Sequence, residues 1–346
     1  MSERAGLRSA RLPVRWLLAA IAAVGVAAVA GLAIGPVRLP PGPVALELLN
    51  QLPFVDLTSG LSEQEAAIVT VLRLPRVVLG LLVGATLAVA GGCYQGVFRN
   101  PLADPYLLGV AAGAGLGATV AIAADAGSTL IPIAAFAGAL SAVALTYALG
   151  QAGDRYRSPA TLLLAGVAVA AFLSAAQTYV QQRNVEAIRE VYTWLLGRLA
   201  TAGWADVRLI APYCLVSLTV MVLSRRLLDV LAVGDEEAAS LGVNPRRIRY
   251  VLILAASLGT AAAVAVSGLI GFVGIIVPHT VRIMVGSSYR LVIPLSLLFG
   301  AAFLVLADLV GRTVQAPAEL PIGVVTAFAG APFFALVLRS SRRVPV

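Results

Sequence analysis

The chain has 346 residues, of which 60% are hydrophobic and only 12% are charged, and its formal net charge is +8. Soluble domains carry about 25% charged residues, so this composition excludes an ordinary soluble globular protein. Apolar runs of about 20 residues recur along the chain, and a run of that length can cross a bilayer as a helix. The arginines lie at the ends of these runs rather than on one face, which argues against nucleic-acid binding. We therefore predict an all-α polytopic membrane protein.

Ten apolar runs are predicted to span the membrane, with the eighth unusually short. In chain order they lie at 14–35, 74–98, 106–124, 130–150, 159–181, 208–228, 247–267, 270–285, 291–311 and 322–339. We interpret the first run as a membrane helix and not as a cleaved signal, whose apolar core has about 7–15 residues. Its own apolar part is longer than that, and further spans follow it.

Arginine bias predicts the orientation of these spans. If the N-terminus is cytoplasmic, arginines on the inner side outnumber those on the outer side by about two to one. An even number of spans then returns the C-terminus to the cytoplasm. We expect a single transmembrane domain over 1–346, with cytoplasmic tails at 1–13 and 340–346 and a cytoplasmic segment at 229–246.

Small residues recur at helical spacing in two of the predicted spans. Gly80 and Gly84 form one G-x-x-x-G pattern, and Gly109, Gly113 and Gly117 form two overlapping ones. Glycines at this spacing share a face and let membrane helices approach closely. The stretch GAGLGA at 113–118 also fits a dinucleotide-binding pattern, but it lies inside a span and does not follow a strand. We therefore favour helix packing.

One polar segment, AVGDEEAASLGVNPRRIRY at 232–250, interrupts this apolar chain. Its acids suit the start of a short helix, Gly242 suits the end, and Asn244-Pro245 begins the next element. A helix of about eight residues is unstable alone in water, so it must pack against something. The segment is either a connector held by neighbouring spans or a contact for another protein, whose groove could accept Ala238, Ala239 and Leu241.

The same segment resembles the coupling segment of ABC importer permeases, and four further stretches resemble signatures of one family of them. These stretches are RLPR at 73–76, GATLAVAGGCYQGVFRNPLADPYLLGVAAGAG at 84–115, GLIGFVGIIVPHTVR at 268–282 and AELPIGVVTAFAGAPFF at 318–334. They follow the order and spacing of the FecCD-type permeases, which import ferric siderophores, haem and cobalamin. The resemblance covers about residues 70 to 340.

The resemblance implies a permease subunit of an ATP-driven importer for ferric siderophores or related iron chelates, with cobalamin or haem as the alternative cargo. It further implies a homodimer, two ATP-binding subunits, a periplasmic or lipid-anchored substrate-binding protein, and the bacterial inner membrane. No cofactor is expected on this chain, and ATP and Mg belong to the partner ATPase. The residues agree, because the chain has no lysine and hence no GxxxxGK[ST] phosphate loop.

The resemblance also assigns candidate site residues. The ATPase-coupling residues are Asp235, Glu236, Glu237, Ala238, Ala239, Leu241 and Gly242. The residues that dock the binding protein are Arg73, Arg76 and Arg312. The cytoplasmic gate comprises Asn100 and Leu102, together with Pro159 and Ala160, where this chain departs from the small hydroxyl residues of a cobalamin-importing relative.

Simpler interpretations of these residues remain open. Arginines at span ends can act as ordinary interfacial anchors, although the outer side should be arginine-poor. Asp308 is a functional candidate at membrane depth, but we favour its pairing with Arg312 one turn later. His279 is the only histidine of the chain and makes a poor metal site.

Two other classes of function fit less well. A secondary transporter would place ion-coupling carboxylates in broken helices at the membrane midplane, and the predicted spans hold almost no acids besides Asp308. A membrane enzyme would need a cluster of acid–base or metal-binding side chains, which the scattered carboxylates and single histidine do not supply.

Overall fold

The computed structural model describes residues 13–51, 57–151 and 159–341. Ten of its helices correspond to the ten predicted spans. They are α1 (Val14–Ala33), α4 (Leu74–Phe98), α5 (Val110–Ala123), α6 (Leu130–Gln151), α7 (Pro159–Arg183), α9 (Trp204–Leu223), α12 (Pro245–Ser267), α13 (Val273–Val285), α14 (Tyr289–Thr313) and α15 (Ile322–Ser341). Among the described residues, seven helices are long and apolar enough to cross a membrane, and three shorter apolar helices accompany them. The all-α polytopic prediction is confirmed.

Shorter elements connect these helices. They are α2 (Pro41–Asn50), α3 (Glu63–Ala67), the π-helix η1 (Ile68–Arg73), the 3-10 helix η2 (Val185–Ala187), α8 (Ile188–Leu195), α10 (Arg225–Val233) and α11 (Asp235–Ser240). The tails predicted at 1–13 and 340–346 lie almost entirely outside the described residues.

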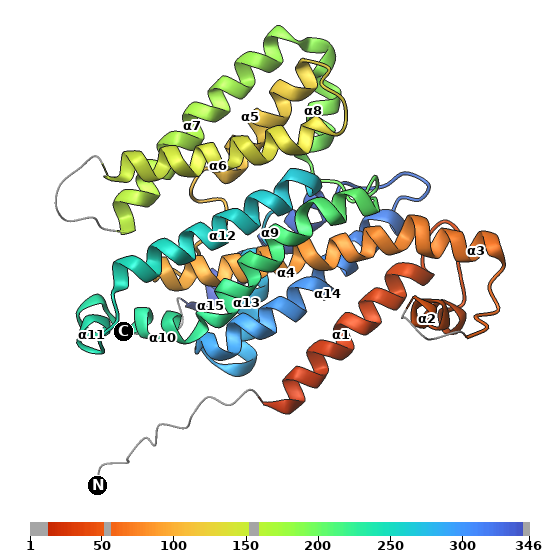
Figure 1. Ribbon diagram of the computed structural model, residues 1–346, viewed down its shortest axis with the longest axis horizontal. Coiled ribbons are helices and arrows are strands. Elements are labelled where there is room, and N and C mark those ends of the chain that lie inside the picture. The colour runs from red at the N-terminus through yellow and green to blue at the C-terminus, as the bar shows by residue number, and fades with distance from the viewer. Residues whose placement is uncertain (1–12, 52–56, 152–158, 342–346) are drawn as a thin grey trace.

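The spanning helices form two packed groups, shown in Figure 1. One group contains α5, α6 and α7, which pack on one another, with α8 beside α5. The other group surrounds α4, which packs against α9, α12, α13 and α14, while α1 lies along α14. Helix α12 joins the two groups because it also packs against α6 and α5. The short α10 and α11 lie at one end of the molecule, and α2 and α3 at the other.

Helix α4 is the centre of the larger group, and every residue from Val83 to Phe98 is buried. Two of its glycines touch neighbouring backbones directly. A Cβ on Gly84 would lie 2.3 Å from the Gly300 carbonyl oxygen of α14, and one on Gly91 would lie 2.1 Å from the Gly274 carbonyl oxygen of α13. Only glycine permits these approaches, which bring backbone against backbone as close packing in membranes requires.

The glycine pattern in α5 is partly confirmed. A Cβ on Gly113 would lie 2.3 Å from the Gly138 carbonyl oxygen, and one on Gly117 would lie 2.1 Å from the Ala134 carbonyl oxygen, both in α6. Gly109, however, precedes the helix and adopts φ +80°, so it is a turn residue and not part of the packing face.

The second span differs from its prediction because its helix begins at Glu63, not at residue 74. Ser62 and Glu65 form a capping box at this start, where the Ser62 hydroxyl accepts from the Glu65 N–H. The π-helical turn at Ile68–Arg73 then leads into Pro75. Proline has no N–H to donate to the preceding turn, and the widened turn accommodates that loss without ending the helix.

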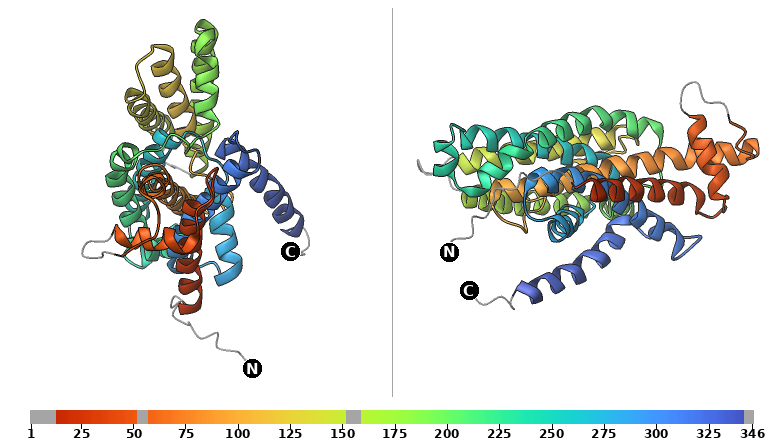
Figure 2. Two further views of the ribbon diagram at one scale, coloured as in Figure 1. Left: turned by 90° about the vertical axis from the view of Figure 1, so that its right-hand side faces the viewer. Right: turned by 90° about the horizontal axis from the view of Figure 1, so that it is seen from below.

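Helix α15 leaves the bundle at an angle, as both views in Figure 2 show. Its start is anchored, since Ile322 is 2% exposed. Further along, Gly330 lies against the ring of Phe272, and Phe333 meets His279 edge-on with ring centroids 5.7 Å apart. Phe328 is 76% exposed, so part of the apolar surface of α15 has no protein neighbour within the described chain.

Replacing Gly91 by leucine tests the backbone contact between α4 and α13. The added side chain meets backbone and not a movable side chain, so we expect a loss of about 3 kcal/mol or more in the free energy of unfolding. The measurement is the thermal unfolding midpoint of the purified protein in detergent. Gly25→Leu in α1 is the control, because nothing lies within 4 Å of a Cβ there. Equal midpoints for the two variants would contradict the proposed packing.

Candidate functional site

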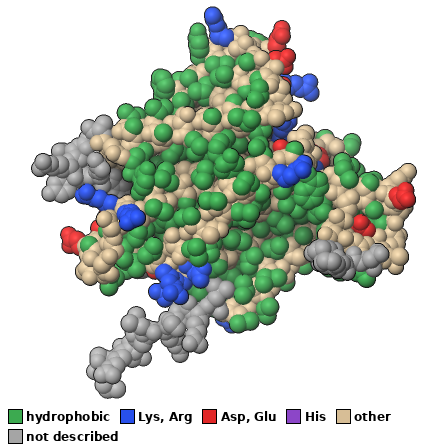
Figure 3. Space-filling model, in the orientation of Figure 1, with side chains coloured by type: hydrophobic (Ala, Val, Ile, Leu, Met, Phe, Trp, Pro, Cys, Tyr) green, Lys and Arg blue, Asp and Glu red, His purple; other side chains and the backbone are tan. Residues whose placement is uncertain are grey.

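The polar segment at 232–250 contains the end of α10, the short helix α11 and the beginning of α12. α10 ends at Val233, Gly234 breaks the chain, and α11 occupies Asp235–Ser240. The Asn244 side chain accepts from the Arg247 N–H and so caps α12, with Pro245 in its first turn as predicted. Acidic side chains project from the end of the molecule where α11 lies (Figure 3). α11 has six residues, fewer than the eight or so expected.

Asp235 fastens α11 to two other helices. Arg249 of α12 donates from Nη1 to Asp235 Oδ2 at 2.6 Å and from Nη2 to Oδ1 at 2.5 Å. Arg99, at the end of α4, donates to the same carboxylate and also to the Leu231 carbonyl oxygen at 2.9 Å. The hydrogen bonds from Arg249, followed by the charges of both arginines, hold the pKa of Asp235 below its usual range. The carboxylate is therefore ionised and bound at neutral pH.

The other candidate coupling residues divide into an inner and an outer set. Ala238 is fully buried against the protein, so it cannot enter a partner's groove as the sequence suggested. Helix geometry explains this correction, because Ala238 lies three residues after Asp235 and so is on the side of α11 that meets Arg99 and Arg249. The exposed set consists of Glu236, Glu237, Ala239, Leu241 and Gly242. Leu241 is 67% exposed, an unusual position for a large apolar side chain beside charged groups.

α10 connects this segment to a third spanning helix. Asp229 accepts from the Tyr289 N–H at 2.6 Å and from the Ser288 hydroxyl at 2.9 Å, at the beginning of α14. A carboxylate at a helix start satisfies free N–H groups and favours the positive end of the helix dipole. Arg290 adds an ion pair to Asp229 at 3.3 Å. α11 is thus bonded to α12 and the end of α4, and α10 is bonded to α14.

The loop after α4 carries the first pair of predicted gate residues. Arg99 ends α4 at φ +49°, and Asn100 Oδ1 accepts from the Leu102 N–H at 3.0 Å, which closes a tight turn. The Leu102 side chain is 39% exposed. Next to the loop, Gln95 Nε2 donates to the Gly274 carbonyl oxygen at 2.9 Å, and Arg282 donates to Gln95 Oε1 at 2.6 Å. These bonds fix the end of α4, just before the turn, to α13.

The second pair, Pro159 and Ala160, begins α7. Ala160 is exposed, while the side chain of Pro159 lies outside the described residues. Further along α7, a Cβ on Gly166 would lie 2.2 Å from the Leu107 carbonyl oxygen. This contact brings α7 against the loop that carries the first pair. The gate assignment of all four residues stays a prediction.

At the opposite end of α4, Arg76 and Arg312 share a buried ionic cluster with two acids. Arg76 donates from Nη2 to Asp308 Oδ1 at 2.8 Å and from Nε to Oδ2 at 2.9 Å. Arg312 lies 3.4 Å from Asp308, as the i, i+4 spacing predicted. Glu319 lies in the connection between α14 and α15. Its carboxylate accepts two hydrogen bonds from the Arg76 guanidinium, at 2.8 and 3.0 Å. These bonds are the main cause that lowers the pKa of Glu319.

Arg73 points in a different direction. Its guanidinium donates to the carbonyl oxygens of Leu32, at 2.6 Å, Ala33, at 3.3 Å, and Val37, at the end of α1. Carbonyl oxygens at a helix end lack intrahelical donors, and a cation there also favours the negative end of the dipole. Arg73 and Arg312 are only 7% and 4% exposed. All three predicted docking arginines therefore have partners inside this chain, and their docking role stays a prediction.

The Asp308–Arg312 pair was predicted from the sequence. The hydrogen bonds of Arg76 to Asp308 and Glu319, which form most of the cluster, were not. Arg76 is 232 residues before Asp308 and 243 before Glu319, so no local spacing signals these pairs. The available signal was the need for a countercharge, since an arginine near a span interior is stable only when paired. Elsewhere among the described residues, no group of three or more His, Cys, Asp or Glu side chains could hold a metal.

These features define a multi-pass α-helical membrane protein, and comparison with known proteins supplies its family. The model of the FecCD transport family matches residues 11–340. The chain therefore belongs to the FecCD transport family, and it is an ABC transporter permease of that family. A solved structure described as an inward-facing conformation of a metal-chelate type ABC transporter superposes with a TM-score of 0.83. It is 28% identical and covers 95% of this chain and 100% of its own.

The names of several relatives refer to different compounds. The chain is 44% identical over 281 residues to a cobalamin import system permease of Halobacterium salinarum, covering 81% of this chain and 75% of the relative. It is 39% identical to an Fe(3+)-citrate import system permease of Bacillus subtilis, covering 86% and 88%. It is 40% identical to a hemin transport system permease of Yersinia pestis, covering 78% and 82%.

Asp308→Asn tests whether this acid neutralises the buried arginines. The substitution leaves Arg76 and Arg312 without their shared countercharge, so we expect a loss of about 3 kcal/mol in the free energy of unfolding. Glu319→Gln is the matched control, because the Glu319 side chain is 35% exposed and its loss should cost about 1 kcal/mol or less. Thermal unfolding in detergent measures both. A control as destabilising as Asp308→Asn would show that Asp308 has no special role.

Proposed function

We propose that this chain is the transmembrane permease subunit of an ATP-driven importer for ferric siderophores or related iron chelates. The proposal is supported by its relatives, which include an Fe(3+)-citrate permease and a hemin permease. Cobalamin or haem is the alternative cargo, favoured by the identity with a cobalamin permease. The observation that carries the proposal is the exposed α11, whose Asp235 is bound by Arg99 and Arg249.

In this mechanism, a separate ATPase pushes on α11. ATP binding draws two ATPase subunits together, and α11 moves with the subunit that contacts Glu236, Glu237 and Leu241. Because Asp235 and Asp229 bind α11 and α10 to α4, α12 and α14, the displacement reaches the spanning helices as a unit. Charge-assisted hydrogen bonds are strong enough to transmit such a movement. ATP and Mg would bind the partner, since this chain lacks the lysine of a phosphate loop.

The substrate path is proposed to lie between two copies of the chain. α7 is the least buried of the spanning candidates, and its Leu164, Val167 and Phe172 are 71%, 62% and 70% exposed. Such a surface needs either lipid or a second protein surface.

A secondary transporter is disfavoured on a different ground. Asp308, the acid that could have coupled an ion, already neutralises two arginines.

Orientation follows from the same mechanism together with the arginine bias. α10, α11 and the beginning of α12 carry Arg225, Arg226, Arg246, Arg247 and Arg249. We propose that this end is cytoplasmic, in a bacterial inner membrane, with both termini on the same side. The Arg76 cluster then faces the periplasm, where a soluble or lipid-anchored binding protein delivers the substrate.

Docking of that binding protein is proposed at the Arg76 cluster. The Arg76 side chain is 12% exposed, compared with 3% for Arg312, and its outer bonds go to the half-exposed Glu319. A carboxylate of the binding protein can therefore replace Glu319 on Arg76 without disturbing Asp308. Arg73 and Arg312 would support the cluster from behind. A pair at such a rim affects association rate and orientation more than affinity.

Reversing Glu236 and Glu237 to arginine tests the coupling surface. Both side chains are exposed, so the fold should persist, while like charges against the ATPase should reduce ATP-dependent uptake about tenfold. Uptake into proteoliposomes and co-purification of the ATPase are the measurements. The charge-matched control is the double variant Glu63→Arg and Glu186→Arg, at the opposite end of the molecule. Full uptake and full ATPase binding after the first reversal would refute the coupling role.

Glu319→Gln tests the docking surface. The Glu319 carboxylate competes with a carboxylate of the binding protein for Arg76. Removing its charge weakens its bonds to Arg76, so we expect the binding protein to associate about threefold faster at low salt. Surface plasmon resonance with the immobilised permease measures the association rate. Glu47→Gln, in α2 at the same end, is the control. Unchanged or slower association for Glu319→Gln would contradict docking at Arg76.

A further inference from the structure

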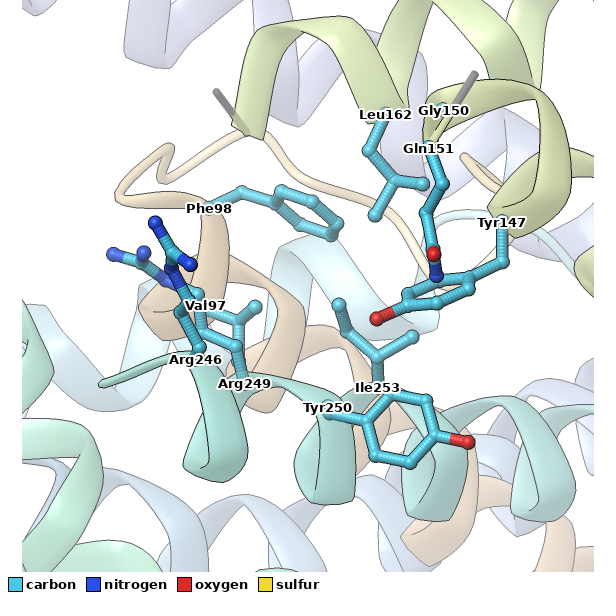
Figure 4. Close-up of a pocket in the computed structure, with 10 residues that line it drawn as sticks. All are labelled: Val97, Phe98, Tyr147, Gly150, Gln151, Leu162, Arg246, Arg249, Tyr250 and Ile253. Atoms are coloured by element: carbon cyan, nitrogen blue, oxygen red, sulfur yellow. The ribbon is translucent and has the colours of Figure 1, made fainter. Parts of the chain in front are cut away.

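A cavity opens beside the coupling segment, between the end of α6 and the beginning of α12. It has a volume of about 120 Å³. Figure 4 shows Tyr147 and Gln151 entering it from α6, while Arg246 and Arg249 stand at its other side on α12. Aromatic, amide and guanidinium groups thus line one cavity at this end of the molecule. This combination suits an anion that also has an apolar part.

The cavity continues into an apolar groove between α6 and α12. A second cavity, of about 600 Å³, shares Tyr147, Gln151, Tyr250 and Ile253 with the first. Its remaining walls are mostly aliphatic and include Ala144. The surface around the groove is apolar, as Figure 3 shows, and large exposed side chains flank it. These are Leu145, Leu149 and Leu254, at 47%, 54% and 45% exposure.

The mouth of the groove carries positive charge that is not fully paired by the described residues. Arg246 is exposed and forms no hydrogen bond or ion pair with any described residue. Arg249 uses Nη1 and Nη2 on Asp235, but its Nε is buried and has no partner in the described part of the chain. The first turn of α12 contains no acid, so the positive end of the helix dipole adds to the same charge. Arg249 is partly buried, so Arg246 is the accessible cation of the mouth.

We propose that this groove is a binding site for an anionic phospholipid. Its phosphate is held at the mouth by the exposed Arg246, and one acyl chain lies along the groove past Tyr250 and Ile253. An anionic head beside an aliphatic tail complements a cationic mouth that opens into an apolar groove. The inference goes beyond the proposed transport function, since it depends neither on the cargo nor on the ATPase. Because Arg249 also holds Asp235, the lipid lies directly beside the coupling helix.

The test compares lipid binding to the purified, delipidated full-length protein by native mass spectrometry. The probes are phosphatidylglycerol and phosphatidylcholine with the same acyl chains, and glycerol phosphate without chains. We expect phosphatidylglycerol to bind at least about fivefold more tightly than either of the others. Arg246→Gln should reduce its binding about fivefold, which corresponds to the roughly 1 kcal/mol contributed by one arginine beside an anionic headgroup.

Two further variants separate this site from general attraction. Arg247→Gln removes the neighbouring exposed charge, which does not line the cavity, and should leave lipid binding unchanged. Ala144→Phe fills the groove and should reduce binding of phosphatidylglycerol while leaving the oligomeric state intact. Equal losses for Arg246→Gln and Arg247→Gln would overturn the proposal, as would equal binding of the two lipids. Dissociation of an oligomer by Ala144→Phe would instead identify a second copy as the occupant and would also overturn it.

Discussion

The contact of α4 with the backbones of α13 and α14 determines where everything else in this protein can lie. Gly84 meets the carbonyl oxygen of Gly300, and Gly91 meets that of Gly274, so no side chain separates the helices there. Within a bilayer, apolar side chains gain little by leaving lipid, and close backbone approach supplies the attraction that the hydrophobic effect provides in water. α4 therefore acts as a rigid axis, and its two ends carry the charged sites at fixed positions.

Both ends of that axis use arginine–carboxylate clusters, but the clusters differ in exposure. At one end Arg76 shares Asp308 with Arg312 in a buried setting, where the removal of one partner leaves an uncompensated charge. At the other end Arg99 and Arg249 share Asp235, whose side chain is 49% exposed. The buried cluster stabilises one arrangement of α4 and α14. The exposed one holds a short helix that could not fold alone, and the outer face of that helix is exposed.

Much of the site could be anticipated from the sequence, but the roles of some residues could not. The acids at 235–237 signalled a short helix, and Asp308–Arg312 followed from a spacing of four. The burial of Ala238 and the bonds from Arg73 to the end of α1 had no local signal, because each depends on which helix lies opposite. Glu319 was overlooked for the same reason. The helix start at Glu63 was missed because Pro75 resembles a beginning, whereas the π-turn absorbs it.

The sequence by itself determined the class, the ten spans and the family resemblance, because hydrocarbon thickness and the need to satisfy every backbone hydrogen bond act on each segment separately. Helix caps belong to the same group, since their partners lie within a few residues. The glycine spacings were visible in the sequence too, but the helices that they contact were not. Only the tertiary structure decided which charges meet, which face of α11 is free and where the groove beside α12 opens. Those outcomes depend on the relative placement of helices up to 243 residues apart in the chain, and residue spacing along the chain does not specify that placement.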